Sequence, residues 1–381
     1  METYLFHLMP YPEIESEAWP YVEDTWDPEK GAQYYQNYIE QLAYADELGI
    51  DGLGFNEHHY TAYGLQPSPN ITGATLAGKT ENAKLAFFGN LPAIRENPVR
   101  LAEELAMLDN ISEGRVVSGF PRGIPKEYLA YNIDLDDSRA RFEEAWDLMI
   151  KTWTEDEPFD FHGEFYEYES VYAWPRPYQQ PHPELWYPAE SEKSIRFAAE
   201  REVPTGTVPA LEDEIGDTFG LYREIAEEEG WTPEDRHFTY LATAYVADSV
   251  EQAREEAEEA MRYNQKRLFL GDHLGTVARM MGDDIYDPDK REVYEENLHP
   301  HGQDALEWTW EDQLEDPGFL VGPPELIVEK LEELYELGGG FGRIVVHLSF
   351  GNMDHEVALG NIERYVDEVK PEVDKIGDVN P

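Results

Sequence analysis

The chain of 381 residues contains no cysteine. This excludes disulfide bonds, thiolate catalysis, zinc–cysteine sites and iron–sulfur clusters. The chain also lacks any run near the roughly 20 apolar residues of a membrane-spanning helix. Residues 1–10 do not join a basic region to an apolar run, so no signal peptide is expected. We therefore expect a cytoplasmic protein without a membrane partner.

Basic residues are scarce: 29 Lys and Arg stand against 81 Asp and Glu, a formal net charge of −52. Self-repulsion of this size strains a compact fold at a Debye length of about 10 Å, and molar salt shortens that length to about 3 Å. The acids are spread over expected helix faces, as at residues 224–229 and 251–259. We interpret them as a coat adapted to concentrated salt; an acidic surface for a basic partner is the alternative. Nucleic acid is not an expected partner, because phosphate binding needs positive charge.

Short apolar segments alternate with longer amphipathic stretches, such as the helix expected over residues 35–48. A 41% apolar fraction with 13% aromatic residues is ample for a large core. Eight strand–helix alternations predict one domain over residues 1–381, a single (β/α)8 TIM barrel. The expected strands are residues 4–8, 52–56, 85–91, 116–120, 185–189, 203–208, 238–246 and 343–348. A doubly wound open sheet is the alternative, but no glycine-rich dinucleotide turn follows the first strand.

Two segments interrupt the alternation. Residues 159–177 are aromatic and polar by turns and predict a hairpin or an extended insert. Residues 264–322 have mixed charge, several prolines and no strong periodicity, and so long an insert is usually functional or mobile. We expect both inserts to leave from loops near the barrel mouth, where they could form a lid.

The densest polar cluster, Asn56-Glu57-His58-His59-Tyr60, lies at the end of the second expected strand. Barrel enzymes hold catalytic groups at the C-terminal ends of their strands. His58 could exchange a proton near neutral pH, with Glu57 orienting it. Two histidines beside a carboxylate could instead bind a metal, but adjacent strand residues point to opposite faces, so no metal site is expected. Two structural histidines bonded to backbone are the plainer alternative.

Two further clusters predict contacts to an anion. Arg122 stands in the turn at residues 119–124 after the fourth strand, where its guanidinium could clamp a phosphate or carboxylate. An ion pair with one of the many acids is the alternative for this arginine. Ser191 and Ser194, beside Glu190, start the helix after the fifth strand, where they could bind an anion or only cap the helix.

Taken in order, these residues and the stretches between them resemble the luciferase-like flavin monooxygenases, from the first strand to the last helix. Asn90 and Leu91, which follow the third expected strand and could line a ring-shaped ligand, belong to this set. The matching stretches are Asn56-Glu57-His58-His59, Asn90-Leu91-Pro92, Ala102-Glu103-Glu104, Ser112-Glu113-Gly114-Arg115, Arg122-Gly123, Arg141-Phe142-Glu143-Glu144-Ala145-Trp146 and Ala189-Glu190-Ser191. No single motif is diagnostic, but so many in one order argue against chance.

The resemblance implies a two-component monooxygenase. A separate flavin reductase supplies reduced FMN, and dioxygen then oxygenates a small organic substrate. His58 corresponds to the family's active-site histidine, which assists proton handling at the reduced flavin, with Glu57 beside it. The implied flavin contacts are Asn90 and Leu91 at the isoalloxazine ring, and Arg122, Glu190, Ser191 and Ser194 at or beside the phosphate. Homodimers are common in the family, and the helix over residues 99–108 is a candidate interface by analogy.

The sequence also departs from the family pattern. Pro125 stands where the family has a tyrosine three residues after Arg122, which puts one flavin contact in doubt. Pro121 replaces a cysteine near the flavin, so light emission is not implied. Relatives on the same barrel bind the deazaflavin F420 and transfer hydride without oxygen; the match around His58 favours FMN over this alternative. A flavin-binding protein without turnover is a further alternative, although storage requires no proton donor.

Overall fold

The strands form a closed parallel barrel. The computed structural model describes residues 1–189, 191–207, 212–282, 287, 290–298 and 300–377. The sheet closes because β9 pairs with both β8 and β11. Its barrel strands are β1 (Glu2–His7), β2 (Gly52–Phe55), β3 (Lys84–Phe87), β4 (Val116–Gly119), β7 (Glu184–Pro188), β8 (Thr205–Thr207), β9 (Phe238–Val246) and β11 (Arg343–His347). The predicted (β/α)8 barrel is confirmed, and every expected strand overlaps an observed one.

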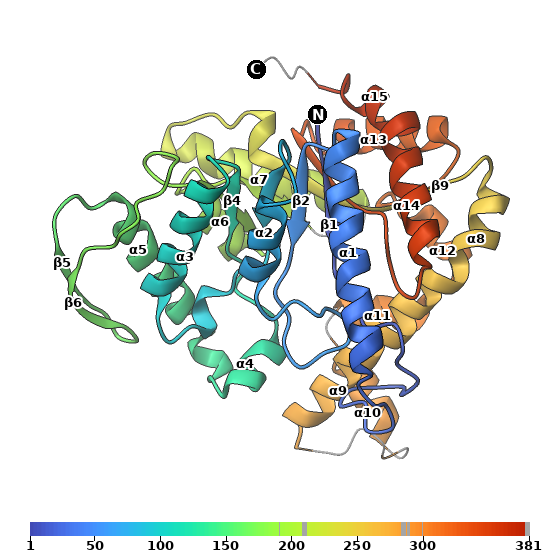
Figure 1. Cartoon of the computed structure of the whole chain (residues 1–381), viewed down its shortest axis with the longest axis horizontal. Coiled ribbons are helices and arrows are strands. Elements are labelled where there is room, and N and C mark those ends of the chain that lie inside the picture. The colour runs from blue at the N-terminus through green and yellow to red at the C-terminus, as the bar shows by residue number, and fades with distance from the viewer. Residues whose placement is uncertain (190, 208–211, 283–286, 288–289, 299, 378–381) are drawn as a thin grey trace.

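Helices cover the outside of this barrel (Figure 1). They include α1 (Pro28–Leu48), α2 (Pro69–Ala77), α3 (Pro98–Ile111), α5 (Ser138–Thr154), α6 (Glu192–Ala199), α7 (Glu212–Glu229), α8 (Val250–Arg262), α13 (Pro324–Leu337) and α14 (His355–Arg364). The first helix begins well before residue 35, because the Asp27 carboxylate accepts the backbone N–H groups of Glu29 and Lys30 and proline opens the first turn. Across the described ranges, no helix has both the length and the apolar character needed to cross a membrane.

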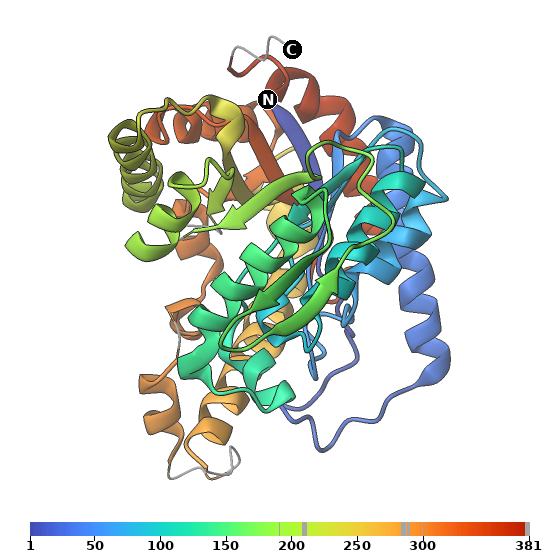
Figure 2. The ribbon, with the colours of Figure 1, turned by 90° about the vertical axis from the view of Figure 1, so that its left-hand side faces the viewer.

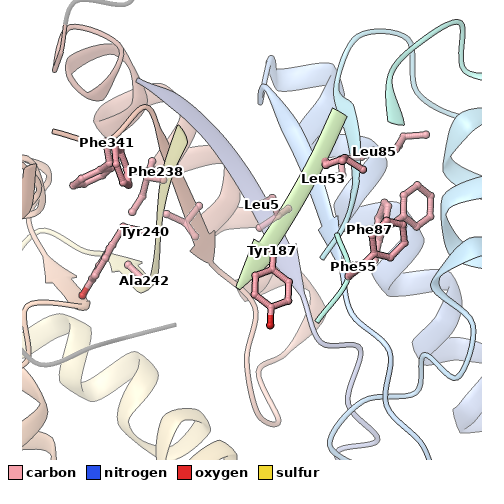
Figure 3. Packing of buried hydrophobic residues seen from close by; sticks show 14 of the residues in the cluster. Leu5, Leu53, Phe55, Leu85, Phe87, Tyr187, Phe238, Tyr240, Ala242 and Phe341 are labelled. Atoms are coloured by element: carbon pink, nitrogen blue, oxygen red, sulfur yellow. The ribbon is translucent and has the colours of Figure 1, made fainter. Parts of the chain in front are cut away.

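Each strand divides its side chains between two cores, as its period of two requires. Outward side chains such as Leu5, Leu53 and Phe238 pack under the helices in the main core (Figure 3). The inward side chains that fill the middle of the barrel include Tyr4, Ala86, Phe88, Val117, Trp186 and Val345. Gly52 also faces inward, since a Cβ there would lie 2.6 Å from the Tyr4 ring. Aromatic rings therefore fill the room that small residues leave inside the barrel.

An ion network closes the N-terminal end of the barrel. Its members, Glu2, Lys84, Glu184 and Arg343, are the first residues of β1, β3, β7 and β11. Arg343 Nη2 lies 3.1 Å from Glu2 Oε2 and 2.7 Å from Glu184 Oε1, and Lys84 Nζ lies 2.9 Å from Glu184 Oε2. Burial raises the pKa of the Glu184 carboxyl, but the charges of Arg343 and Lys84 outweigh that effect and lower the pKa to about 2. This end is thus structural, and the C-terminal ends of the strands are left for function.

The insert at residues 159–177 forms an antiparallel hairpin of β5 (Phe159–His162) and β6 (Glu167–Val171). It lies against the outer face of α5 (Figure 2), where its aromatic side chains pack. Glu144 of α5 accepts hydrogen bonds from the backbone N–H groups of residues 164–166 at the hairpin tip. The expectation that this insert leaves near the mouth is wrong. It joins the end of α5 to the start of β7, and such a connection begins at the N-terminal side of the barrel.

The insert at residues 264–322 is mostly helical. It contains a π-helical turn (Tyr263–Leu270), α9 (Gly271–Met280), α10 (Arg291–Glu296), α11 (Pro300–Glu307) and α12 (Trp310–Glu315). The sequence shows no strong periodicity there because these helices are short. The expected boundary at Gly322 is too late, since β10 (Phe319–Gly322) pairs in parallel with residues 243–246 of β9. The helices α9 and α10 lie beside the mouth, near α4 (Pro125–Tyr131) in Figure 1.

Glu184→Gln tests the network at the closed end. The variant should lose about 3 kcal/mol of unfolding free energy at neutral pH, because the buried guanidinium of Arg343 then loses one of its two carboxylate partners. A carboxyl with a lowered pKa stabilises the fold above its unfolded pKa and loses that effect as pH falls through the folded value. The difference between wild type and variant should therefore shrink from about pH 4.5 to about pH 2 in urea titrations at molar KCl. A difference that does not depend on pH would contradict the assignment.

Candidate functional site

His58 is held at the C-terminal mouth of the barrel by two elements. The chain leaves β2 at Phe55, and the backbone N–H of His58 donates to the Gln66 carbonyl at 3.2 Å. Its Nδ1 lies 3.0 Å from Oε1 of Glu127 on α4. The Tyr63 ring packs on the imidazole, with centroids 4.6 Å apart. The His58 side chain is 15% exposed and that of Glu127 only 1%, so a buried carboxylate orients an imidazole that reaches the mouth.

Glu57 does not make the contact with His58 that the sequence suggested. Its Oε1 lies 2.8 Å from Nε2 of His59, and its Oε2 accepts hydrogen bonds from Leu91 N at 3.1 Å and from Arg95 Nη2 at 2.6 Å. The reason is that consecutive side chains after β2 point in different directions. Glu57 therefore fixes the loop after β3, and Glu127 takes the place beside His58.

His59 belongs to a separate buried group. Besides its contact with Glu57, its Nδ1 lies 3.2 Å from the Tyr131 hydroxyl. The two neighbouring histidines thus contact different carboxylates, and their side chains do not point at a common site. Within the ranges that the structure describes, no three His, Asp or Glu side chains are placed to share a metal ion.

Arg122 stands at the rim, where a serine and no described acid is its side-chain partner. Its Nη1 donates to Ser138 Oγ at 3.2 Å, and its carbonyl accepts the Tyr128 hydroxyl. Among the described residues it forms no ion pair with a carboxylate. Burial raises the pKa of Tyr187 on β7, and the nearby charges of Arg139 and Arg122 oppose this. Two guanidinium groups therefore lie near one part of the rim.

The start of α6 lies beside this arginine, because β4 and β7 are adjacent strands. Ser191 caps the helix: Ser194 N donates to Ser191 Oγ at 3.3 Å, and Ser191 N donates to Ser194 Oγ at 2.9 Å. The capping alternative is thus realised, and the exposed Ser191 hydroxyl also lies at the rim. Glu190 lies outside the described residues.

Asn90 and Leu91 follow β3 and are both buried. Asn90 Nδ2 donates to Asn70 Oδ1 at 3.0 Å, which turns the amide toward α2. Its Oδ1 has no hydrogen-bond partner among the residues described. Leu91 donates its backbone N–H to Glu57, so the same buried carboxylate fixes this loop. Both residues lie near the mouth, and Asn90 Oδ1 is an acceptor that no described residue uses.

A buried ion pair connects the two sides of the mouth. Lys126 of α4 pairs with Asp272 of α9, and their side chains are 2% and 4% exposed. The Lys126 ammonium lies 4.4 Å from the Trp19 ring centre, and the Tyr21 hydroxyl lies 3.5 Å from Asp272 Oδ1. Burial lowers the pKa of Lys126, and the charge of Asp272 opposes that effect. The ring of Phe269, in the same insert, packs on Tyr63 beside His58, so the pair holds the insert over the site.

Sequence reasoning missed both Lys126 and Glu127. They directly follow Arg122-Gly123-Ile124-Pro125, and that proline marks the first turn of a helix. This signal could have placed α4. It could not have revealed the partners of the two side chains, which lie 146 and 69 residues away in the chain.

Lys126→Met tests the ion pair at the mouth. Removing one partner leaves Asp272 buried and uncompensated, so the variant should lose about 3–5 kcal/mol of unfolding free energy. The double variant Lys126→Met/Asp272→Leu should recover most of this loss, because it leaves no buried charge. Chemical denaturation of both variants measures the difference. Equal losses in the single and double variants would show that the pairing is not what matters.

Comparison with known proteins adds the family. The flavin-dependent trigonelline monooxygenase oxygenase component of Acinetobacter baylyi is 30% identical over 244 residues, which cover 63% of this chain and 67% of that protein. The oxygenating constituent of 3,6-diketocamphane monooxygenase from Pseudomonas putida, solved in complex with FMN, has a TM-score of 0.76 at 24% identity, over 97% of this chain and 98% of its own. An F420-dependent secondary alcohol dehydrogenase has a TM-score of 0.67 at 16% identity, over 98% of both chains. The family model for luciferase-like monooxygenases matches residues 19–340, and the chain belongs to that family.

Proposed function

We propose that this protein is the oxygenase component of a two-component flavin-dependent monooxygenase. It takes reduced FMN from a separate reductase and uses dioxygen to oxygenate a small organic substrate. The observation that carries the proposal is Arg122. In a chain with 81 acidic residues, this rim guanidinium forms no ion pair among the described residues. Such a group at the C-terminal end of a barrel strand is suited to a phosphate. The names of the relatives support flavin as the carrier of that phosphate.

The residues around Arg122 fit a flavin phosphate and ring. Arg122 would pair with the phosphate, and the Ser191 hydroxyl and the amides at the start of α6 would donate to it. Glu190 and Ser194 would lie beside this contact. Asn90 Oδ1 has no partner among the described atoms and would accept a hydrogen bond from the ring, with Leu91 against its face. When bound, reduced flavin supplies the electrons that activate dioxygen.

His58 handles protons in this proposal. Its Nδ1 is held by Glu127, which fixes the ring and leaves Nε2 to exchange a proton at the mouth. Glu57 acts indirectly, by fixing His59 and the loop after β3 that would line the flavin. The insert held by Lys126 and Asp272 excludes water from the site.

A homodimer through α2 and α3 is part of the proposal. Ile71 on α2 and Met107 and Ile111 on α3 are exposed by 71%, 56% and 51%. Large apolar side chains on adjacent helices of a strongly acidic protein favour contact with a second copy. The acidic coat favours work at molar salt, and the assays below are set there.

His58→Ala and Glu127→Gln test the proton role. After mixing with dioxygen, the return of bound reduced FMN to its oxidised spectrum should slow by about 100-fold in the first variant and less in the second. FMN affinity should stay unchanged in both, because neither side chain is placed at the phosphate. Glu157→Gln, at an exposed loop position, is the matched control. Stopped-flow rates in His58→Ala equal to wild type would remove this residue from the mechanism.

An anaerobic titration in molar KCl tests the cofactor. Reduced FMN should bind more tightly than reduced F420, and Arg122→Ala should weaken FMN by about 10-fold or more while affecting riboflavin little. Arg236→Ala, at an exposed arginine that precedes β9, controls for the change in net charge. Preference for F420 would move the function to hydride transfer. Equal losses for FMN and riboflavin would exclude the phosphate contact, and flavin bound without turnover over a substrate panel would favour a binding protein.

A further inference from the structure

The imidazole of His58 is supported on three sides at the barrel mouth. Glu127 holds its Nδ1, and the Tyr63 ring packs on it with centroids 4.6 Å apart. Gly64 lies at the Cδ2 edge, where a Cβ would stand 3.1 Å from His58 Cδ2 and 3.2 Å from the Leu8 carbonyl oxygen. The side chain stays 15% exposed, so these contacts leave one edge of the ring to the opening. Together they set the direction in which Nε2 points.

The insert at residues 264–322 holds Tyr63 in turn. Phe269, on the π-helical turn Tyr263–Leu270, packs edge-on against it with ring centroids 4.5 Å apart. The chain neighbours of these two residues, Leu268 and Ala62, belong to one buried cluster. π-Helical turns are rare and occur mostly at functional sites. The three rings of His58, Tyr63 and Phe269 therefore form a chain of contacts from the mouth to the insert.

A polar route reaches another side of the imidazole from the same insert. Asp272 pairs with Lys126 of α4, and the next residue of α4, Glu127, binds His58. The π-helical turn runs directly into α9, so Phe269 and Asp272 belong to one uninterrupted helical segment. This helical segment therefore supports the imidazole from two sides, through the aromatic rings and through α4.

Close backbone packing fixes where this helical segment lies. The backbone N–H of Trp19 donates to the Gly271 carbonyl at 3.0 Å. A Cβ on Gly271 would lie 2.7 Å from the Glu17 carbonyl oxygen, and one on Gly275 only 2.0 Å from that of Trp19. Glycine permits this close approach of two backbones because it has no Cβ. The seated position of the segment is therefore closely defined, and leaving it would withdraw both supports of His58.

We propose that Tyr63 and Phe269 are positioning residues for His58: their rings hold the imidazole in its working orientation only while the insert is seated. This rests on the proposed function in that His58 is taken to handle protons at bound flavin. A displacement of about 1 Å at a reacting group lowers a rate by as much as about 100-fold, so a loosened imidazole transfers protons slowly. The seated insert also excludes water. One movement of the insert therefore controls both the access of water and the orientation of His58.

Removing either ring tests this chain of contacts. Phe269→Leu and Tyr63→Leu should slow the return of bound reduced FMN to its oxidised spectrum by about 10-fold, and Tyr63→Phe, which keeps the ring, should not. Affinity for reduced FMN should stay unchanged in all three variants, because none of them alters Arg122 or Ser191. Phe165→Leu, the same change at a partly buried ring of the β5–β6 hairpin, is the matched control.

A double variant separates positioning from general damage. If Phe269 acts through His58, then His58→Ala/Phe269→Leu should react no more slowly than His58→Ala alone. Stopped-flow mixing in molar KCl measures these rates. A rate in Phe269→Leu equal to wild type, an additive loss in the double variant, or a parallel loss of FMN affinity overturns the proposal.

A measurement on the flavin-free protein does not depend on the proposed function. The Nδ1–H proton that His58 donates to Glu127 should give a far-downfield ¹H signal that is absent in His58→Ala. Its exchange with water should become about 10-fold faster in Phe269→Leu and stay unchanged in Tyr63→Phe. Equal exchange in wild type and Phe269→Leu overturns the inference.

The wild type supplies a check that needs no variant. As urea is added below the unfolding transition, the His58 proton and the backbone N–H groups of residues 263–270 should become exchangeable together. Separate dependences on urea overturn the inference. If the flavin titration fails while these responses hold, the proposed function is wrong and the coupling between the insert and His58 stands. If flavin binds and His58→Ala slows its oxidation but Phe269→Leu changes nothing, only this inference fails.

Discussion

Positive charge is in short supply in this molecule, and the few buried cations decide which elements meet. A carboxylate can enter the interior only where a cation or several donors neutralise it. Arg343 and Lys84 satisfy this condition at the closed end of the barrel, and Arg95 satisfies it for Glu57. Lys126 does the same for Asp272 at the mouth. Each pair joins segments distant in the sequence, so the pairing scheme itself specifies how strands, loops and insert are assembled.

The mouth contains two pairs of a carboxylate and an imidazole, and the two pairs differ in how deeply they are buried. Glu57 and His59 are both deeply buried and hold the loop after β3, so this pair is part of the scaffold. Glu127 is buried, but His58 reaches the opening, so this pair is the one that the proposed function uses. The two histidines are adjacent in the chain, and the turn after β2 separates their roles. Two adjacent histidines of one short polar motif can therefore differ in both partner and exposure.

The sequence was sufficient for the barrel and for the positions of most candidates, because strand periodicity and polar residues after strands are local signals. Arg122 and His58 were placed correctly at the mouth for that reason. The partners of these side chains could not be predicted, because Glu127 and His58 lie 69 residues apart in the chain. The strand β10 was also missed, because it follows several short helices in the long insert.

The burial of the Lys126–Asp272 pair has a consequence for how the protein responds to its medium. Added salt screens the repulsion among surface acids over a few ångströms, but it hardly reaches charges that are 2% and 4% exposed. Ionic strength therefore changes the repulsion among the surface acids, but it leaves the Lys126–Asp272 pair almost unchanged. The contact between α4 and α9 at the mouth should therefore hold equally well in dilute buffer and in molar salt.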